Sequence, residues 1–197
     1  MKLNWAERLA VNNPLRPLQQ RLEINWYYRR VRLEAESRIL EIGCGRGAGA
    51  LLIKNTFHLR HVHAMDLDID MIRKADLYLS HKEKDGISFL VGDVCALPFE
   101  DSAMDAVFGF GVLHHVPDWQ RALDEIVRVL KCGGFYFFEE LYPSLYQNFI
   151  TRRILLHPAE NRFDSETLKK TIVASGLVMR DCLENRHLEI LGYAAKM

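Results

Sequence analysis

Residues 38–49 read RILEIGCGRGAG, and this stretch decides the fold. A short apolar run, which predicts a buried strand, leads into glycines at alternate positions. Because glycine lacks a Cβ, such a turn folds tightly and brings backbone amides close to a ligand. A carboxylate, Glu41, stands two places before the first glycine. The stretch therefore predicts a nucleotide-type cofactor held at the end of a strand.

The composition predicts one domain over residues 1–197. With 49% hydrophobic residues the chain can bury one substantial core, but it is too short for two full-sized domains. The formal net charge is zero, so no overall positive field draws the protein to nucleic acid or to an anionic membrane. Arginines do gather near the N-terminus, either as a solvated helix surface or as a patch facing an anionic substrate. They are Arg16, Arg21, Arg29, Arg30 and Arg32.

Neither a metal centre nor a disulfide framework is expected. The four cysteines lie far apart in the sequence without paired spacing, which is typical of reduced thiols. His58, His61 and His63 lie in or before a strand away from the glycine turn, so we assign them no metal. The sequence shows neither a signal peptide nor an apolar run of membrane-spanning length, and we expect a cytoplasmic protein.

Strand-length apolar segments alternate with amphipathic segments of helix length from residue 38 onward. This alternation predicts a mainly parallel sheet covered by helices. The expected strands are residues 38–43, 61–66, 87–92, 105–112, 135–141, 177–183 and 188–195. The junction between the last two is so short that only an antiparallel hairpin can join them.

Capping residues mark the expected helix ends. The expected N-caps are Asp68 and Asp118. A glycine stop, the Gly133–Gly134 pair, is expected after a helix over residues 119–130, and a last helix is expected over residues 165–175.

The segments that flank the alternation are expected to cover the site. Residues 1–37 predict an N-terminal helical cap. Residues 142–163 form a polar and aromatic excursion with two prolines, which we expect to act as a lid. An acceptor pocket is expected between them, over the carboxyl ends of the strands. Its expected aromatic lining is Trp26, Tyr27, Tyr28, Tyr142 and Tyr146, with lid packing as the alternative role.

Two kinds of cofactor fit the glycine turn. Gly43, Gly45 and Ala48 satisfy the loose dinucleotide pattern, and Asp66 is near its acidic position. A nicotinamide dinucleotide places its pyrophosphate against the turn, where Glu41 would repel it. A cofactor with an ammonium and a sulfonium reverses this argument, because the carboxylate then balances positive charge.

The sequence [DE]-x-G-x-G-x-G at residues 41–47 resembles the glycine motif of class I S-adenosylmethionine-dependent methyltransferases. Later segments resemble the family's following motifs in order, at residues 65–72, 91–99, 105–117 and 129–134. Within the family, VLHHVP at 112–117 is similar to small-molecule enzymes related to ubiquinone and menaquinone biosynthesis. The resemblance implies a Rossmann-like three-layer α/β sandwich. Its seven-stranded, mostly parallel sheet would have the order 3-2-1-4-5-7-6 and an antiparallel last strand.

The resemblance also implies S-adenosylmethionine as cofactor, with S-adenosylhomocysteine as product, and roles for matching residues. Asp66 would accept hydrogen bonds from both ribose hydroxyls, with capping of the next helix as the alternative. Leu67 and Met71 would pack on the adenine, although Met71 also fits ordinary core packing. The adenine amino edge and the methionine moiety would be bound by Glu41, Gly43, Cys44, Gly45, Gly47, Gly92, Asp93, Val94 and Phe110.

Methyl transfer from a sulfonium is an in-line displacement with an activated leaving group. Alignment and exclusion of water can therefore supply most of the catalysis, without a metal or a nucleophilic residue of the protein. A hydroxyl or phenol acceptor benefits from a base, and His114 or His115 is the natural candidate, with shaping of the pocket as the alternative. Of the two, we assign the catalytic role to His115. His114 is expected in the acceptor pocket, and the acceptor is expected to be a small molecule.

Two other functions stay open. An RNA or protein methyltransferase would use the arginines around Arg29, although the Asn/Asp-Pro-Pro-Tyr/Phe sequence of amino-methyltransferases is replaced by Phe108–Gly111. A cofactor-binding module without activity would keep the same motifs. No sequence pattern indicates an oligomeric state.

Overall fold

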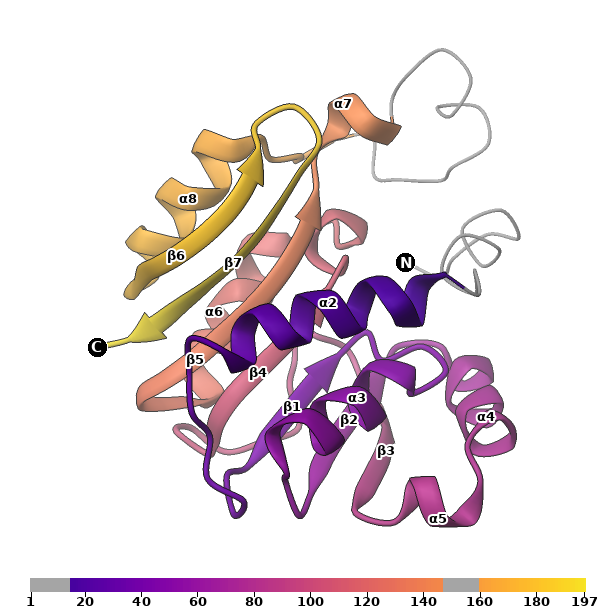
Figure 1. The fold of residues 1–197 in the computed structure, drawn as a ribbon. Coiled ribbons are helices and arrows are strands. Elements are labelled where there is room, and N and C mark those ends of the chain that lie inside the picture. Colours follow the sequence, from indigo (N-terminus) through magenta and orange to yellow (C-terminus); the bar gives the residue numbers. More distant parts are fainter. Residues whose placement is uncertain (1–14, 147–159) are drawn as a thin grey trace.

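A computed structural model describes residues 15–146 and 160–197 of the chain (Figure 1). Its centre is a seven-stranded sheet with the order β3-β2-β1-β4-β5-β7-β6. Strands β1 to β5 pair in parallel, and β7 runs antiparallel to both β5 and β6. The predicted strand order and the antiparallel last strand are therefore confirmed.

The elements follow the predicted alternation. The strands are β1 (Ile39–Ile42), β2 (Val62–Asp66), β3 (Ile87–Val91), β4 (Met104–Phe110), β5 (Leu130–Leu141), β6 (Leu177–Asn185) and β7 (Glu189–Lys196). The helices are α2 (Arg16–Tyr28), α3 (Ala48–Phe57), α4 (Ile69–Tyr78), α5 (His81–Lys84), the 3₁₀ turn η1 (Leu113–His115), α6 (Trp119–Val129), α7 (Pro143–Tyr146) and α8 (Ser165–Ala174).

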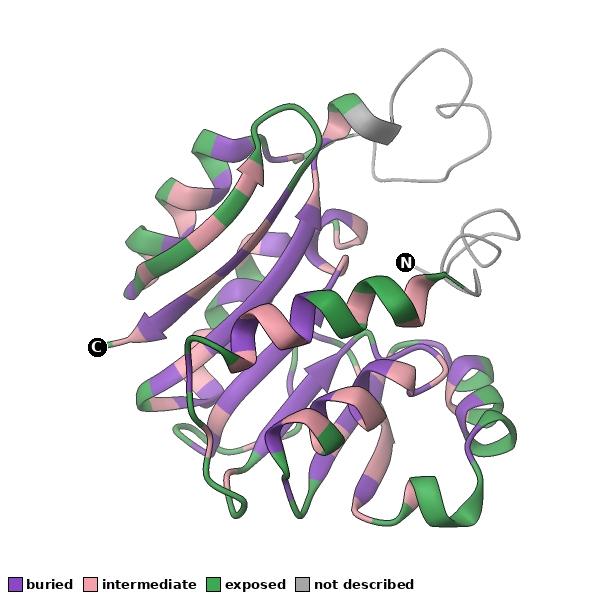
Figure 2. Ribbon diagram, in the orientation of Figure 1, coloured by how far each residue is buried: buried purple, intermediate pink, exposed green. Residues whose placement is uncertain are grey.

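Helices cover both faces of the sheet, which makes the three-layer sandwich. α2 and α3 lie on one face, and α6 and α8 lie on the other (Figure 1). Residues of β1 alternate between two apolar clusters, because Leu40 and Ile42 face the α6 side and Ile39 faces the α2 side. The whole of β1 is buried, as Figure 2 shows for the centre of the sheet. Strands covered on both faces are continuously apolar for this reason.

The helix α2 supplies the described part of the predicted N-terminal cap. Tyr27, near the end of α2, is fully buried, and its hydroxyl donates to the carbonyl oxygen of Phe138 at 2.7 Å. At the next residue of β5, the carboxylate of Glu139 forms an ion pair with the guanidinium of Arg16 at 2.8 Å. The hydrogen bond and the ion pair both join α2 to the carboxyl half of β5.

The predicted N-caps are confirmed. Oδ1 of Asp68 accepts from the amide of Asp70 at 3.1 Å, and Oδ1 of Asp118 accepts from the amide of Arg121 at 3.4 Å. Each carboxylate satisfies an amide that has no partner within the helix.

The predicted glycine stop after α6 is wrong. α6 ends at Val129, and the Gly133–Gly134 pair lies inside β5, which begins five residues earlier than expected. Pairing with β4 jumps from Met104 opposite Leu130 to Ala106 opposite Phe135, so the strand bulges between these points. Gly133 takes a φ of +79° there, a conformation that suits glycine. The pair serves a bulge rather than a helix end.

The predicted lid at residues 142–163 lies largely outside the described residues. The structure describes α7 at its start and residues 160–163 at its end, so the lid stays a prediction. Within the described residues, no helix has the length and apolar character needed to cross a membrane.

Candidate functional site

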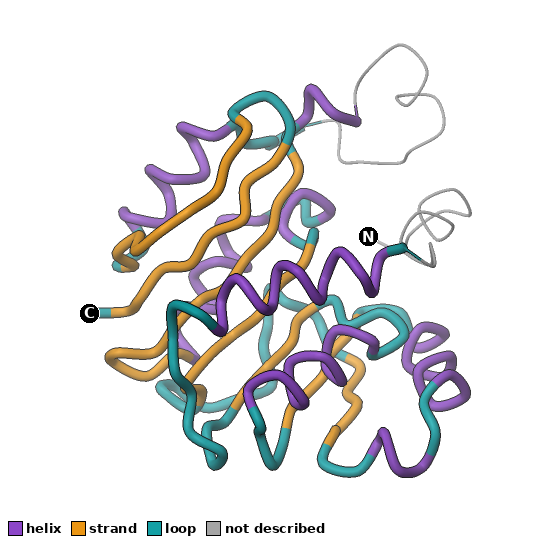
Figure 3. The backbone as a smooth tube through the Cα atoms, in the orientation of Figure 1, coloured by secondary structure: helices purple, strands orange, loops and turns teal. Residues whose placement is uncertain are grey.

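The loops after β1, β2 and β4 meet at one edge of the sheet, because these strands run in parallel (Figure 3). A cavity of about 370 Å³ opens at this edge. The predicted site residues that line it are Gly43, Gly45, Asp66, Leu67, Met71, Gly92, Asp93, Val94, Phe110 and His115. The structure therefore brings together residues from separate motifs.

Asp66, at the carboxyl end of β2, is fixed by backbone amides. Its Oδ2 accepts from the amide of Gly45 at 2.9 Å, and its Oδ1 accepts from the amide of Asp68 at 2.8 Å. Burial raises the pKa of this carboxyl, and the amides oppose the shift by stabilising the charge. The alternative that Asp66 caps α4 is wrong, since the N-cap is Asp68.

The glycine turn packs closely against the segment that follows β4. Gly43 has a φ of +64°, and a Cβ built there would lie 2.7 Å from Cγ2 of Val112. Gly47 does not line the cavity, and instead begins α3 with a φ of +78°, where a Cβ would lie 2.8 Å from the ring of Phe89. Cys44 is buried beside the turn, and its amide donates to the carbonyl of Met65 at 3.0 Å.

Glu41 lies behind the turn, on the side of α2 and α3, and does not line the cavity. Its carboxyl is 1% exposed, and burial raises its pKa to about 8, with repulsion from Asp66 adding to the shift. Its Oε1 lies so close to α3 that a Cβ on Gly49 would meet it at 2.0 Å. Its Oε2 is buried without a hydrogen-bond partner among the described residues.

The adenine-binding residues that we expect form another part of the wall. Leu67 is 43% exposed, whereas Met71 is 1% exposed yet still lines the cavity. Oδ1 of Asp93 accepts from the amide of Cys95 at 2.8 Å, which orders the loop after β3. Val94 follows it, largely buried.

The segment after β4 closes the cavity with Val112, His115, Val116 and Pro117. His114, in the same turn, faces the other way and is buried. Its Nδ1 lies 2.7 Å from Oε2 of Glu140, and its ring centroid lies 4.3 Å from that of His115. Sequence reasoning missed Glu140, although a carboxylate at the end of a long apolar strand signals a buried charge that needs partners.

The predicted acceptor tyrosines do not line this cavity. Tyr27 and Tyr142 are buried, and the hydroxyl of Tyr142 donates to Glu184 at 2.6 Å. The ring of Tyr28 packs edge-on against that of Phe57, at 5.5 Å between centroids. The Trp26 ring stacks beneath the guanidinium of Arg30 at 3.8 Å. The side chain of Tyr146 lies outside the described part of the chain.

Carboxylates also gather around Arg16 at the interface of α2 with the sheet. Arg16 contacts Glu139 at 2.8 Å and Glu23 at 3.5 Å. Burial raises the pKa of Glu23 to about 7 and also raises that of Glu139. Arg16, one of the arginines of the predicted patch, therefore forms ion pairs at the interface between α2 and the sheet.

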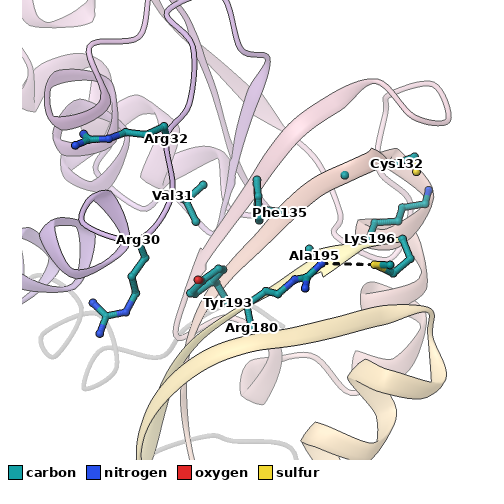
Figure 4. A pocket seen from close by; sticks show the side chains of 11 residues that line it. Arg30, Val31, Arg32, Cys132, Phe135, Arg180, Tyr193, Ala195 and Lys196 are labelled. Carbon is teal, nitrogen blue, oxygen red and sulfur yellow. Dashed lines mark hydrogen bonds between the residues drawn. The ribbon is translucent and has the colours of Figure 1, made fainter.

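A second cavity, of about 510 Å³, lies at the opposite edge of the sheet (Figure 4). It is lined by Phe135, by Tyr193 and by arginines that include Arg30 and Arg32 of the predicted arginine patch, but by none of the residues predicted to bind the cofactor. Figure 4 shows the guanidinium groups of Arg30 and Arg32 directed away from that of Arg180, so these cations do not converge on one ligand. Within residues 15–146 and 160–197, no group of three metal-ligating side chains is found.

Comparisons with known proteins agree with this arrangement. Residues 40–138 match the family described as "Methyltransferase domain". The chain is 36% identical over 151 residues to phthiotriol/phenolphthiotriol dimycocerosates methyltransferase 1 of Mycobacterium ulcerans, covering 72% of this chain and 54% of that protein. It is 32% identical to the fatty-acid O-methyltransferase of Mycolicibacterium smegmatis, over 64% of this chain and 48% of that protein. The chain thus spans about half the length of these relatives.

A solved structure shares the fold over its full length. The S-adenosylmethionine-dependent methyltransferase of Aquifex aeolicus superposes with a TM-score of 0.74 at 14% identity, covering 100% of both chains. The ordered motifs, the sheet and the family match lead to one assignment. The chain belongs to the class I S-adenosylmethionine-dependent methyltransferases.

Proposed function

We propose that the chain binds S-adenosylmethionine in the cavity at the ends of β1, β2 and β4 and transfers its methyl group to a small-molecule acceptor. The observation that carries this proposal is the Asp66 carboxylate, fixed beside the open glycine turn at 2.9 Å from the Gly45 amide. A carboxylate held in this way at a strand end suits a pair of ribose hydroxyls.

The residues present fit this cofactor. Gly43 and Gly45 line the cavity, and because glycine lacks a Cβ a ligand can approach their backbone closely. Glu41 has a buried oxygen without a hydrogen-bond partner among the described residues, and its raised pKa marks a site where a nearby positive charge would be stabilising. Leu67 and Met71 offer an apolar surface for the adenine, and Asp93 with Val94 offers polar groups for its edge.

The bound cofactor would supply an activated methyl group. The protein's part is then to align the acceptor and to exclude water. The turn at Val112–Pro117 forms the wall at which the acceptor would approach. His115 lies in this wall, and it would take the proton from a hydroxyl acceptor during transfer.

We propose an apolar, lipid-like acceptor. The names of the two relatives above give phthiotriol-type and fatty-acid substrates for those proteins. The cavity wall next to His115 is apolar, with Val112, Val116 and Pro117.

A reducing compartment such as the cytoplasm suits the four free cysteines.

Turnover tests the proposal directly. Purified protein would be incubated with S-adenosylmethionine and a panel of fatty acids and hydroxylated lipids, and products would be identified by mass spectrometry. The expected result is a methylated lipid together with S-adenosylhomocysteine. Transfer only to RNA or protein would refute the small-molecule acceptor. Tight S-adenosylhomocysteine binding without turnover on any panel would favour the non-catalytic module.

A further inference from the structure

Glu140 is a fully buried carboxylate whose hydrogen bonds go to one segment of the chain. It stands near the end of β5 with 0% exposure. Its Oε1 accepts from the amides of Val112 at 3.2 Å and Leu113 at 2.8 Å. Its Oε2 accepts from the amide of His114 at 3.2 Å and lies 2.7 Å from Nδ1 of the same residue. A buried charge is stable only with such a set of donors.

The segment that Glu140 holds is the wall of the cavity. Val112 and His115 line it from either side of the anchored amides. Val112 is also pressed against the glycine turn, since its Cγ2 lies 2.7 Å from the place of a Cβ on Gly43. The segment therefore lies between the buried carboxylate of Glu140 and the cavity.

Glu140 also fixes the ring of His114. The carboxylate accepts from Nδ1, so the ring carries its hydrogen there and is held in one orientation. The His115 ring lies against it, with centroids 4.3 Å apart and planes at 40°. His114 is thus a fixed backing surface for the ring that faces the cavity.

We infer that Glu140 is a positioning residue for methyl transfer, acting through His114 and the amides of residues 112–114 to set His115 in the cavity wall. This rests on the proposed function, because the acceptor is taken to approach that wall. Glu140 itself contacts neither cofactor nor acceptor. Its effect belongs to the rate of the transfer step rather than to cofactor affinity.

The variant Glu140→Gln tests the inference. In either orientation of the glutamine amide, its NH₂ group would face two N–H groups that donate to the carboxylate in the wild type, so those two hydrogen bonds are lost. We expect kcat to fall by about 10- to 100-fold, the scale of a small misplacement near the reacting atoms. The Kd for S-adenosylhomocysteine should stay within about threefold of wild type, since Asp66 and the glycines are untouched. Asp105→Asn is the matched control, because Asp105 also accepts a backbone amide, from Arg38 at 2.8 Å, at the opposite edge of the sheet.

Replacements of His114 give a second test within the same pair. Asn places an N–H group near the position of Nδ1, whereas Leu removes the donor. His114→Asn should therefore retain more of kcat than His114→Leu. Equal losses in both, or a wild-type kcat in folded Glu140→Gln, would overturn the inference.

A measurement without turnover separates this inference from the proposed function. Long-range ¹⁵N–¹H spectra report the tautomer and surroundings of each histidine ring. In Glu140→Gln, we expect the resonances of both His114 and His115 to shift. If His115 keeps its wild-type resonances, the inference fails even where turnover is observed. If the resonances shift while the wild type shows no turnover on any acceptor, the positioning holds and the proposed function fails.

Discussion

The amide nitrogen of Gly45 lies 2.9 Å from Oδ2 of Asp66, so one hydrogen bond joins the glycine turn after β1 to the end of β2 at the cavity wall. The other carboxylate oxygen holds the amide of Asp68 at 2.8 Å, at the start of α4. Asp66 therefore orders the wall from which the proposed cofactor would be bound. Removal of the Asp66 carboxylate should therefore reduce both cofactor binding and the stability of the fold.

Asp66→Ala should abolish cofactor binding and weaken the fold. At about a hundredfold excess over Kd, S-adenosylhomocysteine should stabilise the wild type by about 2.7 kcal/mol, and the variant should lose most of this gain. Without ligand, the two unpaired amides should cost about 1–3 kcal/mol of unfolding free energy. Urea unfolding with and without ligand measures both. Asp76→Ala, which removes an exposed carboxylate from α4, should keep the ligand effect, and retention of that effect in Asp66→Ala would contradict the proposed site.

Gly43 and Gly133 separate the effect of backbone strain from the effect of a steric clash within the glycine turn. Both have positive φ, +64° and +79°, but a Cβ on Gly43 would lie 2.7 Å from Val112 whereas one on Gly133 would meet nothing within 4 Å. A methyl group on Gly43 would force the glycine turn and Val112 apart, so Gly43→Ala should weaken S-adenosylhomocysteine binding by more than tenfold, and Gly133→Ala should leave it unchanged. Each should lose about 1–2 kcal/mol of stability from the left-handed conformation. Calorimetric titration compares the affinities, and equal affinity in both variants would contradict a cofactor site at the glycine turn.

The sequence predicted those parts of the site that depend on local motifs. Asp66 and the glycines near Gly43 stand at the ends of strands, where their position in the chain already fixes their place at the edge of a parallel sheet. The sheet order followed from the family resemblance and from the short hairpin before β7.

Contacts between distant residues escaped prediction. Glu140 meets His114 across 26 residues, and Arg16 meets Glu139 across 123 residues, so no local spacing marks either pair. Tyr27 was expected in the acceptor pocket, yet its side chain packs from α2 into the core with its hydroxyl on the carbonyl oxygen of Phe138, because an aromatic residue on a helix packs equally well into a core. The Gly133–Gly134 pair shows the same ambiguity, since positive φ serves both helix ends and bulges.

The raised pKa of Glu41 predicts a stability that falls as pH rises. Its folded-state pKa is about 8, above the ordinary 4.5, so between these values the folded state binds more protons than the unfolded state. The free energy of unfolding should therefore decrease from pH 5 to pH 8.5, by an amount on the order of a few kcal/mol. Glu23, with a pKa of about 7, adds to the same trend.

Glu41→Gln should flatten this pH dependence without removing the part due to Glu23. Urea unfolding at pH 5.5 and 8.5 gives the comparison, and the variant should gain stability relative to wild type at the higher pH. An exposed carboxylate change, Glu166→Gln, should leave the wild-type slope intact. An unchanged slope in Glu41→Gln would mean that its carboxyl is not held in the buried position described.

A substitution at Gly49 tests the buried position of the Glu41 carboxyl through a steric clash rather than through charge. A Cβ on Gly49 would lie 2.0 Å from Oε1 of Glu41, and the nearest other group is the side-chain amide of Gln20 at 3.2 Å. Gly49→Ala should therefore destabilise the fold by about 1–3 kcal/mol, as overpacking of a filled site does. Shortening the neighbour should relieve the clash, so the double variant Glu41→Ala/Gly49→Ala should lose less stability than the two single changes add up to. Urea unfolding of all four proteins gives the coupling energy, and strict additivity would show that the Glu41 carboxylate does not lie against the first turn of α3.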